Sequence, residues 1–316
     1  MAPRADGRRP AALTVATDAL RQLPPELVAV WLLVSVVACE IGATYSRLPA
    51  AELYHVSGSG LAGGASRVLV FANFPVALIA LAIAAVAFDR VSGAVPRGLA
   101  LLAAVLCAAV FWPGVVSQAN LDAKPVNALA AVGVAAALGL TLAVARGGIA
   151  RWRRRRFDAG RLGLAVVLLV VAAPWVAADL GFFLDGVPVL GRLFRTAPPA
   201  RALPGLPPFP PYVHHGHHHG MDGLLLVVSA LLLSRIVPDV RSSAVRGALT
   251  FYLALMFCYG LGNIANDFWT EQVVKRGWSA WQFPNVLEPS VNVAWAIVVV
   301  AAVVVALVVR PRHVPP

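Results

Sequence analysis

The sequence predicts an all-α fold: a polytopic integral membrane helical bundle of about eight transmembrane helices, with both ends of the chain on the cytoplasmic side. Three observations lead to this prediction. Of the 316 residues, 59% are hydrophobic and only 13% are charged, whereas a soluble domain carries about 25% charged residues. The apolar residues come in blocks of about 20, the length of a helix that crosses the hydrocarbon core. The arginines gather in alternate connections between these blocks, as the positive-inside rule requires.

Each block is expected to be a helix, because the bilayer offers the backbone no water and a helix satisfies its own N–H and C=O groups. In chain order the blocks cover residues 27–45, 68–88, 98–116, 126–145, 162–180, 221–237, 245–266 and 291–309. Pro75 falls inside the second block and predicts a kink there. Residues 1–25 and 311–316 are expected to be cytoplasmic tails, and residues 26–310 to form the membrane domain.

The basic residues decide the orientation. With the N-terminus in the cytoplasm, 18 of the 26 Lys and Arg residues lie on the cytoplasmic side, and the opposite orientation would reverse this ratio. The densest run, residues 151–156, is expected to anchor the topology against anionic lipid, with phosphate binding as the alternative. The net charge of +11 therefore reflects topology and predicts no nucleic-acid partner. The near absence of Lys is typical of a GC-rich bacterial genome, which predicts a bacterial cell (inner) membrane.

The strongest functional signal is a run of histidines directly before the sixth block. Five of the seven histidines fall within six positions, on the external side: His214, His215, His217, His218 and His219. The proline-rich connection over residues 181–220 that contains them favours a stiff, extended backbone. Asp222 follows His218 by four residues and His219 by three, so these side chains share a face if the sixth helix begins near residue 217.

Imidazole is the commonest protein ligand for transition metals, and zinc takes three or four nitrogen or oxygen ligands from such a set. The five histidines and Asp222 are therefore predicted to hold a divalent transition metal: Zn, Fe or Cu. Two alternatives remain open. One is a peripheral loop that binds metal weakly, and the other is a pH-responsive or structural patch.

Acidic residues gather on the same external side. Glu40 lies inside the outer end of the first block, where an ionisable group is costly and faces a cavity or a partner; an ion pair with Arg67 or another external arginine is the structural alternative. Asp267 and Glu271 share a helix face with Asn263 if the seventh helix continues beyond the bilayer. The glycine-rich residues 57–64 and the turn at Asp122 are interpreted mainly as loops, with an anion nest in the former as a weak alternative.

The spacing His214-x-x-His217-His218 resembles one histidine box of the membrane desaturase and hydroxylase family. That family builds a di-iron centre from several separated boxes on the cytoplasmic side. Here the remaining histidines are the solitary His55 and His313, and the cluster faces outward, so membership is rejected. The ceramidase-like zinc hydrolases offer an analogy in chemistry alone. The HExxH signature of membrane metalloproteases does not occur.

These features favour a membrane-embedded, metal-dependent hydrolase or oxidase that acts on a lipid or other apolar substrate at the outer leaflet. In this hypothesis the metal activates water or oxygen, and Glu40, Asp267 or Glu271 serves as general acid or base. The alternatives are a transporter or permease for a metal ion or small solute, a non-catalytic accessory subunit, and a metal-free cyclase in which Glu40 and Asp222 donate the protons. The expected partner is the lipid bilayer; the sequence identifies no protein partner.

Overall fold

The computed structural model describes residues 22–47, 57–117, 120–179, 186–189, 191, 219–274, 276–282, 286 and 291–309. Every regular element in these residues is a helix. The elements are α2 (Pro25–Arg47), α3 (Gly60–Phe71), η2 (Ala72–Val76), α4 (Ala77–Arg90), α5 (Ala94–Cys107), η3 (Ala108–Phe111), α6 (Asn127–Ala145), α7 (Asp158–Asp179), α9 (His219–Leu233), η4 (Val237–Asp239), α10 (Ser243–Trp269), η5 (Thr270–Val274) and α11 (Val293–Val309). The predicted all-α fold is confirmed.

The helices are those of a membrane protein. Five helical stretches are long and apolar enough to cross a bilayer: Pro25–Arg47, Gly60–Arg90, Ala94–Phe111, Asn127–Ala145 and Ser243–Val274. Two shorter helices, in α9 and α11, are also apolar, and α7 contains 22 residues. Each of the eight predicted blocks therefore falls on helical structure, while eight crossings remains a prediction.

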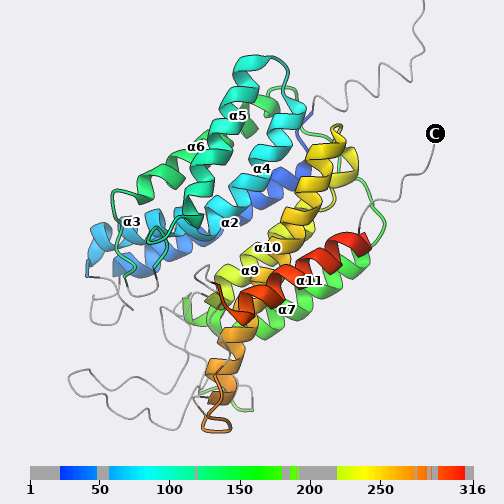
Figure 1. Ribbon diagram of the computed structural model, residues 1–316. Coiled ribbons are helices and arrows are strands. Elements are labelled where there is room, and N and C mark those ends of the chain that lie inside the picture. The colour runs from blue at the N-terminus through cyan, green and yellow to red at the C-terminus, as the bar shows by residue number, and fades with distance from the viewer. Residues whose placement is uncertain are drawn as a thin grey trace, which may run out of the picture.

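The helices form two groups that meet along α4, α9 and α10 (Figure 1). In the first group α2 packs on α3, and α4, α5 and α6 pack on one another. In the second group α9 packs on α7 and α10, and α10 also packs on α11. Following the predicted orientation, we call the end that holds residues 90–97, 146–158 and 235–246 the cytoplasmic end, and the opposite end the external end.

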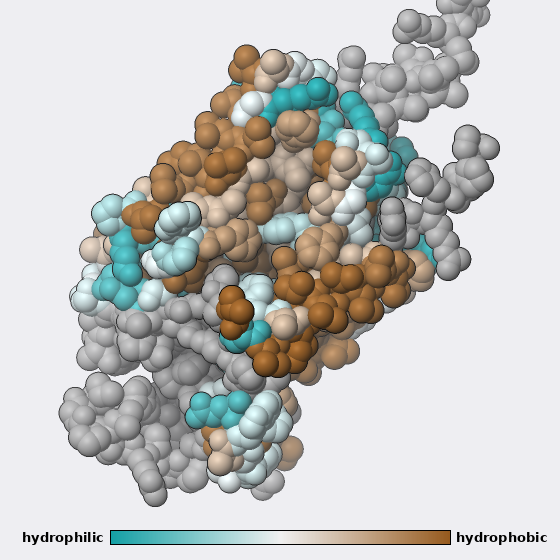
Figure 2. Space-filling view, in the orientation of Figure 1, coloured by the Kyte–Doolittle hydropathy of each residue, from teal (hydrophilic) through white to brown (hydrophobic). Residues whose placement is uncertain are grey.

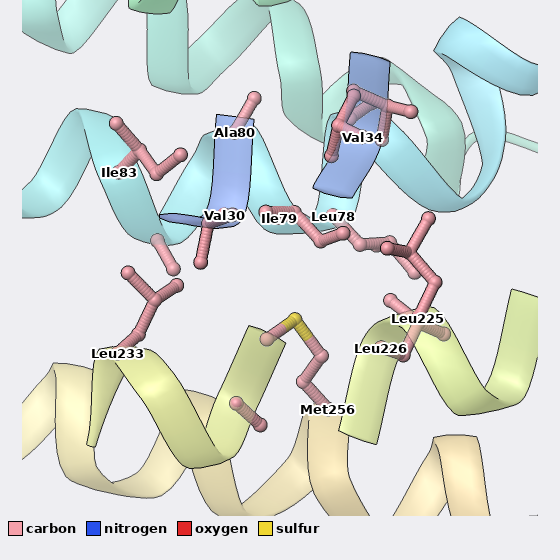
Figure 3. Close-up of a cluster of buried hydrophobic side chains, with 14 of the residues drawn as sticks. Val30, Val34, Leu78, Ile79, Ala80, Ile83, Leu225, Leu226, Leu233 and Met256 are labelled. Carbon is pink, nitrogen blue, oxygen red and sulfur yellow. The ribbon is translucent and has the colours of Figure 1, made fainter. Parts of the chain in front are cut away.

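The buried core lies where the two groups meet (Figure 3). Its labelled side chains come from four helices: Val30 and Val34 from α2, Leu78, Ile79, Ala80 and Ile83 from α4, Leu225, Leu226 and Leu233 from α9, and Met256 from α10. The outer faces of α5, α6 and α11 are hydrophobic as well (Figure 2). Val105 is 60% exposed and Val300 is 62% exposed. Such faces suit a hydrocarbon solvent, because lipid chains are as apolar as the side chains they touch.

Small residues let α9 and α10 approach closely. A Cβ atom added at Gly223 would lie 2.6 Å from the carbonyl oxygen of Gly260, and one added at Gly260 would lie 2.7 Å from that of Gly223. Membrane helices use such small residues to bring their backbones into contact. This crossing fixes the external half of α9 against α10, which is where the predicted site residues lie.

The predicted kink at Pro75 is confirmed. Phe74 departs from helical geometry, with φ −153° and ψ 123°, so α3 and α4 are two segments separated by η2. Asn73 holds this break in place, since its side-chain nitrogen donates to the carbonyl oxygens of Leu69 at 3.0 Å and Asn127 at 2.7 Å. The second contact ties the break to the external end of α6.

Candidate functional site

The predicted metal ligands lie around the start of α9. His214, His215, His217 and His218 fall outside the described residues, and of His219 only the helical backbone is described. Asp222 lies in the first turn of α9 and is 3% exposed. The described residues contain no group of three or more His, Cys, Asp or Glu side chains that could hold a metal ion. Most of the predicted set lies beyond them, so the metal site stays a prediction.

Asp267 holds the start of α9 against α10. The backbone N–H of Gly220 donates to Oδ2 of Asp267 at 2.5 Å, and the Asp267 side chain is 2% exposed. The first N–H groups of a helix have no partner within the helix, and a carboxylate there is also favoured by the helix dipole. Asp267 therefore has a structural task, capping α9, that the sequence did not reveal.

Asn263 lies one turn below Asp267 on the same face of α10 and is 1% exposed. The side-chain nitrogen of Asn263 donates to the carbonyl oxygen of Tyr259 at 3.0 Å. Gly223 of α9 lies close to Asn263, since a Cβ atom added at Gly223 would be 3.1 Å from the Cβ of Asn263. The prediction that Asn263, Asp267 and Glu271 share a helix face requires the helix to continue past Asp267. It does continue, beyond Trp269, as the π-helical turn η5. The side chain of Glu271, in that turn, lies outside the described residues.

Glu40 is half-buried on α2, one turn before Thr44, whose hydroxyl donates to its Oε1 at 3.0 Å. The structure describes no ion pair between Glu40 and Arg67. The guanidinium carbon of Arg67 instead lies 5.6 Å from the centre of the Tyr45 ring, and the residue is 3% exposed. The described contacts contain no Glu40–Arg67 pair, and a pair of Glu40 with another external arginine stays open.

The two external turns are bonded to each other. The Asp122 carboxylate accepts from the backbone N–H of Ser57, at 3.1 and 3.2 Å, and from the Ser57 hydroxyl at 2.7 Å. The N–H of Ala123 donates to the hydroxyl of Ser66 at 2.9 Å. An N–H group that the anion-nest interpretation would offer to a ligand is therefore occupied by the protein's own carboxylate. Ser57 and Asp122 thus lie in structural connections, whereas Gly60–Gly64 belong to α3, so the loop interpretation is wrong for those residues.

A small apolar pocket with a volume of about 30 Å³ lies against the middle of α10. Its walls come from η2 and α4, from η3 and the turn after it, and from α10 and α11: Phe74, Leu78, Val110, Phe111, Val116, Tyr252, Leu255, Met256, Tyr259 and Trp295. The rings of Phe74 and Tyr259 meet edge to face at 5.9 Å, and those of Tyr259 and Trp295 stack at 5.1 Å. The Tyr252 hydroxyl donates to the carbonyl oxygen of Leu78 at 2.8 Å, so the walls remain apolar.

Comparison of this chain with protein-family models, curated proteins and solved structures finds no match. The functional argument therefore rests on the geometry alone. Sequence reasoning missed the pocket, although part of its signal is visible along α10. Tyr252, Met256 and Tyr259 recur at helical spacing on one face, but only the folded chain shows that Phe74 and Trp295 complete the wall.

The cytoplasmic end contains a second group of ionisable residues, centred on Arg235. Its Nε donates to Oε1 of Glu26 at 3.0 Å, its Nη1 forms an ion pair with Asp158, and its Nη2 donates to the carbonyl oxygen of Arg153 at 2.6 Å. Its guanidinium carbon lies 4.2 Å from the centre of the Trp152 ring. The arginine-rich connection is therefore attached to α2, α7 and the end of α9, and this cluster is structural.

Proposed function

We propose that this membrane protein is a metal-dependent enzyme that acts on a lipid or another apolar substrate at the external face of a bacterial cell membrane. One observation supports the proposal above the others. The buried Asp267 caps the start of α9 at Gly220, two residues before the buried Asp222 and directly after the histidine run.

One face of α10 carries several of the residues on which this proposal depends. Met256, Tyr259, Asn263 and Asp267 follow one another at intervals of three or four residues, so they line one side of the helix. Asp267 lies eight residues beyond Tyr259, which corresponds to about 12 Å along the axis. An apolar substrate that lies along this face would thus have its reactive end near the start of α9.

The residues have distinct roles in this proposal. The five histidines and Asp222 would hold the metal, a divalent Zn, Fe or Cu ion, which would activate water as a Lewis acid or, in the case of Fe or Cu, would activate oxygen. Asp267 positions Asp222 by capping α9, and Glu40 or Glu271 serves as general acid or base.

The described core favours an enzyme over the competing transporter. A transporter for a metal ion or a small solute needs polar side chains along its path through the bilayer. Where the two groups of helices meet, α2, α4, α9 and α10 are joined by aliphatic side chains (Figure 3). Two further competitors are an accessory subunit, in which the histidines can be replaced without loss of a chemical activity, and a metal-free cyclase, which needs no bound metal.

The experiment that tests the proposal measures metal content by mass spectrometry on untagged protein purified in detergent. The variant His217→Ala/His218→Ala/His219→Ala is compared with the matched variant His55→Ala/His313→Ala, which removes histidines outside the run. About one equivalent of a single metal, lost in the first variant and kept in the second, supports the proposal. No metal, or variable amounts of several metals, contradicts it.

A further inference from the structure

We propose that the connection between α6 and α7 binds the head group of a phospholipid that carries two phosphate groups, in the leaflet that this end of the bundle faces. Four exposed arginines of the connection contact the phosphates: Arg151, Arg153, Arg154 and Arg156. We call these four side chains the arginine cluster. The inference goes beyond the proposed function because it concerns the opposite end of the bundle and needs no metal.

The backbone of this connection is held in place by the rest of the protein. The N–H of Leu23 donates to the carbonyl oxygen of Gly148, and the carbonyl oxygen of Leu23 accepts from the N–H of Ala150, both at 2.9 Å. Farther along the connection, Nη2 of Arg235 donates to the carbonyl oxygen of Arg153 at 2.6 Å. A ligand that binds here therefore meets an ordered backbone, which lowers the entropic cost of binding.

The positive charge of the arginine cluster is not neutralised within the described part of the chain. The carboxylates described at this end bind other groups of the protein: Glu26, Asp89, Asp158 and Asp239. Arg155 pairs with Asp239, and the described ion pairs include none of the four arginines of the cluster. Like charges this close in sequence repel one another, and a bound polyanion removes that repulsion.

The ends of α6 and α7 place the connection at the depth of lipid head groups. α6 ends at Ala145 and α7 begins at Asp158. Exposed leucines occur about one turn from both points, since Leu142 is 60% exposed and Leu162 is 66% exposed. Four residues of helix correspond to about 6 Å along the axis. The connection therefore begins within a short distance of side chains that face the lipid tails.

Two exposed aromatic side chains of the connection favour a membrane partner over a soluble one. Trp152 is 53% exposed and Phe157 is 68% exposed. The guanidinium carbon of Arg235 lies 4.2 Å from the centre of the Trp152 ring, and that of Arg156 lies 4.7 Å from the centre of the Phe157 ring. Trp is enriched at the boundary between membrane and water, and apolar rings beside basic groups are typical of surfaces that bind anionic lipid. On the face shown in Figure 2, hydrophilic residues border the hydrophobic helix faces at this end.

The density of the arginine cluster favours a head group with two phosphates over a head group with one. A guanidinium group binds a phosphate through two parallel hydrogen bonds, so one phosphate leaves part of the cluster unsatisfied. Six consecutive residues span at most about 20 Å, which keeps the four arginines within reach of a single head group. When two phosphates belong to one molecule, the second binds at a high effective concentration once the first is bound.

The test measures bound lipid by native mass spectrometry of the full-length protein in a neutral detergent. The protein is titrated with cardiolipin, which carries two phosphates, and with phosphatidylglycerol, which carries one, at equal concentrations of phosphate. We expect one cardiolipin per chain, bound about tenfold more tightly than phosphatidylglycerol because it engages more of the arginines. Equal binding of the two lipids, or uptake of cardiolipin that does not saturate at one, would overturn the inference. This comparison needs no variant.

Variants separate the arginine cluster from the total charge of this end. Arg153→Gln/Arg156→Gln should lower the affinity for cardiolipin about tenfold. The matched control Arg97→Gln/Arg241→Gln removes two exposed arginines of the same end that lie outside the connection, and it should keep the preference for cardiolipin. Arg153→Lys/Arg156→Lys keeps the charge but loses the planar fork, so most of the preference should disappear. Equal losses in the first variant and its control would contradict a site in the connection.

Inorganic pyrophosphate, which carries two phosphates but no lipid chain, tests the source of the ligand. It should displace little cardiolipin at an equal concentration, because it gains nothing from the apolar side chains beside the connection. Complete displacement would identify a soluble diphosphate as the ligand and overturn the assignment to a lipid. The outcome is independent of the metal experiment, since a chelator should leave lipid binding unchanged and Arg153→Gln/Arg156→Gln should keep its metal content.

Discussion

The two ends of the bundle use charged residues in different ways. At the cytoplasmic end three described carboxylates pair with arginines: Glu26 and Asp158 with Arg235, and Asp239 with Arg155. A fourth, Asp89, accepts from the backbone N–H groups of Arg241 and Ser242. At the external end the described contacts of Asp267 and Asp122 are with backbone N–H groups and a serine hydroxyl. Carboxylates thus bond to backbone N–H groups at both ends, and the described ion pairs lie at the cytoplasmic end.

This difference predicts which of these charged residues matter more for folding and which for ligand binding. A buried ion pair loses much of its value when one partner is removed, because the other charge stays behind without compensation. A carboxylate that caps a helix contributes less to stability but places its negative charge at a chosen point. We therefore expect substitutions of the cytoplasmic ion pairs to act mainly on folding, and substitutions of the external carboxylates to act mainly on ligands.

The largest effect is expected from Arg235→Ala. Arg235 and Glu26 are both buried, so the change leaves Glu26 without its partner and should lower the free energy of unfolding by about 3 kcal/mol. Denaturation curves in mixed micelles measure it. The matched control is Arg154→Ala, an exposed arginine at the same end of the bundle, in the connection between α6 and α7. Equal losses in the two variants would show that the cytoplasmic end depends on its total positive charge rather than on this pair.

Asp267→Ala is expected to have the next largest effect on stability. It removes the acceptor for the Gly220 N–H and should cost about 1–2 kcal/mol, as the loss of a helix cap does. Asp267→Asn keeps an oxygen at that place and should recover most of the loss. If the external proposal is correct, Asp267→Ala also lowers the metal content, because Asp222 and the end of the histidine run move with the start of α9. A full metal content in Asp267→Ala would remove Asp267 from the proposed site.

The two ends should also respond to different pH ranges. The hydrogen bond from Arg235 holds the pKa of Asp158, which precedes the apolar part of α7, below its ordinary value. Its contribution to stability is therefore complete above the unfolded value of about 3.9 and is lost as the pH falls through the folded value. Histidines bind metal as neutral imidazole, so metal should dissociate as the pH falls from about 7 to 5.

Metal content and thermal stability, measured on the same samples at each pH, check this separation. Asp158→Asn should remove part of the acid-dependent loss of stability below about pH 4 and leave the metal profile unchanged. Coincident profiles for the two quantities would show that the ends are coupled.

Helix positions followed from the sequence where composition alone decides them. The block at 126–145 agrees with α6, Asn127–Ala145, within a residue, because a uniform apolar stretch ends where polar residues begin. The block at 68–88 was too short, since the helical stretch begins at Gly60. Gly63 and Gly64 pack on the backbone of Tyr45 and Gly42 of α2, and a hydropathy pattern cannot show that a weakly apolar turn is held by a neighbouring helix.

The candidate site was less accessible to sequence reasoning. Local spacing placed Asn263 and Asp267 on one helix face, and both are buried there. The contact between Asp267 and Gly220, 47 positions apart, exists only because Gly223 and Gly260 let α9 and α10 touch. The pocket likewise joins four segments whose adjacency is set by packing. Periodicity describes one helix at a time, so it cannot predict contacts of this kind.

The smallest effect is expected from Ser57→Ala. The change removes the hydroxyl donor to Asp122 but keeps the two backbone contacts at 3.1 and 3.2 Å, so the free energy of unfolding should fall by about 0.5 kcal/mol or less. Asp122→Ala removes the acceptor of all three contacts and should cost more than Ser57→Ala but less than Arg235→Ala. Denaturation curves for the three variants under one condition give that order. A loss in Ser57→Ala as large as that in Arg235→Ala would mean that an exposed external turn supports the bundle as strongly as a buried ion pair, and the contrast between the two ends would not hold.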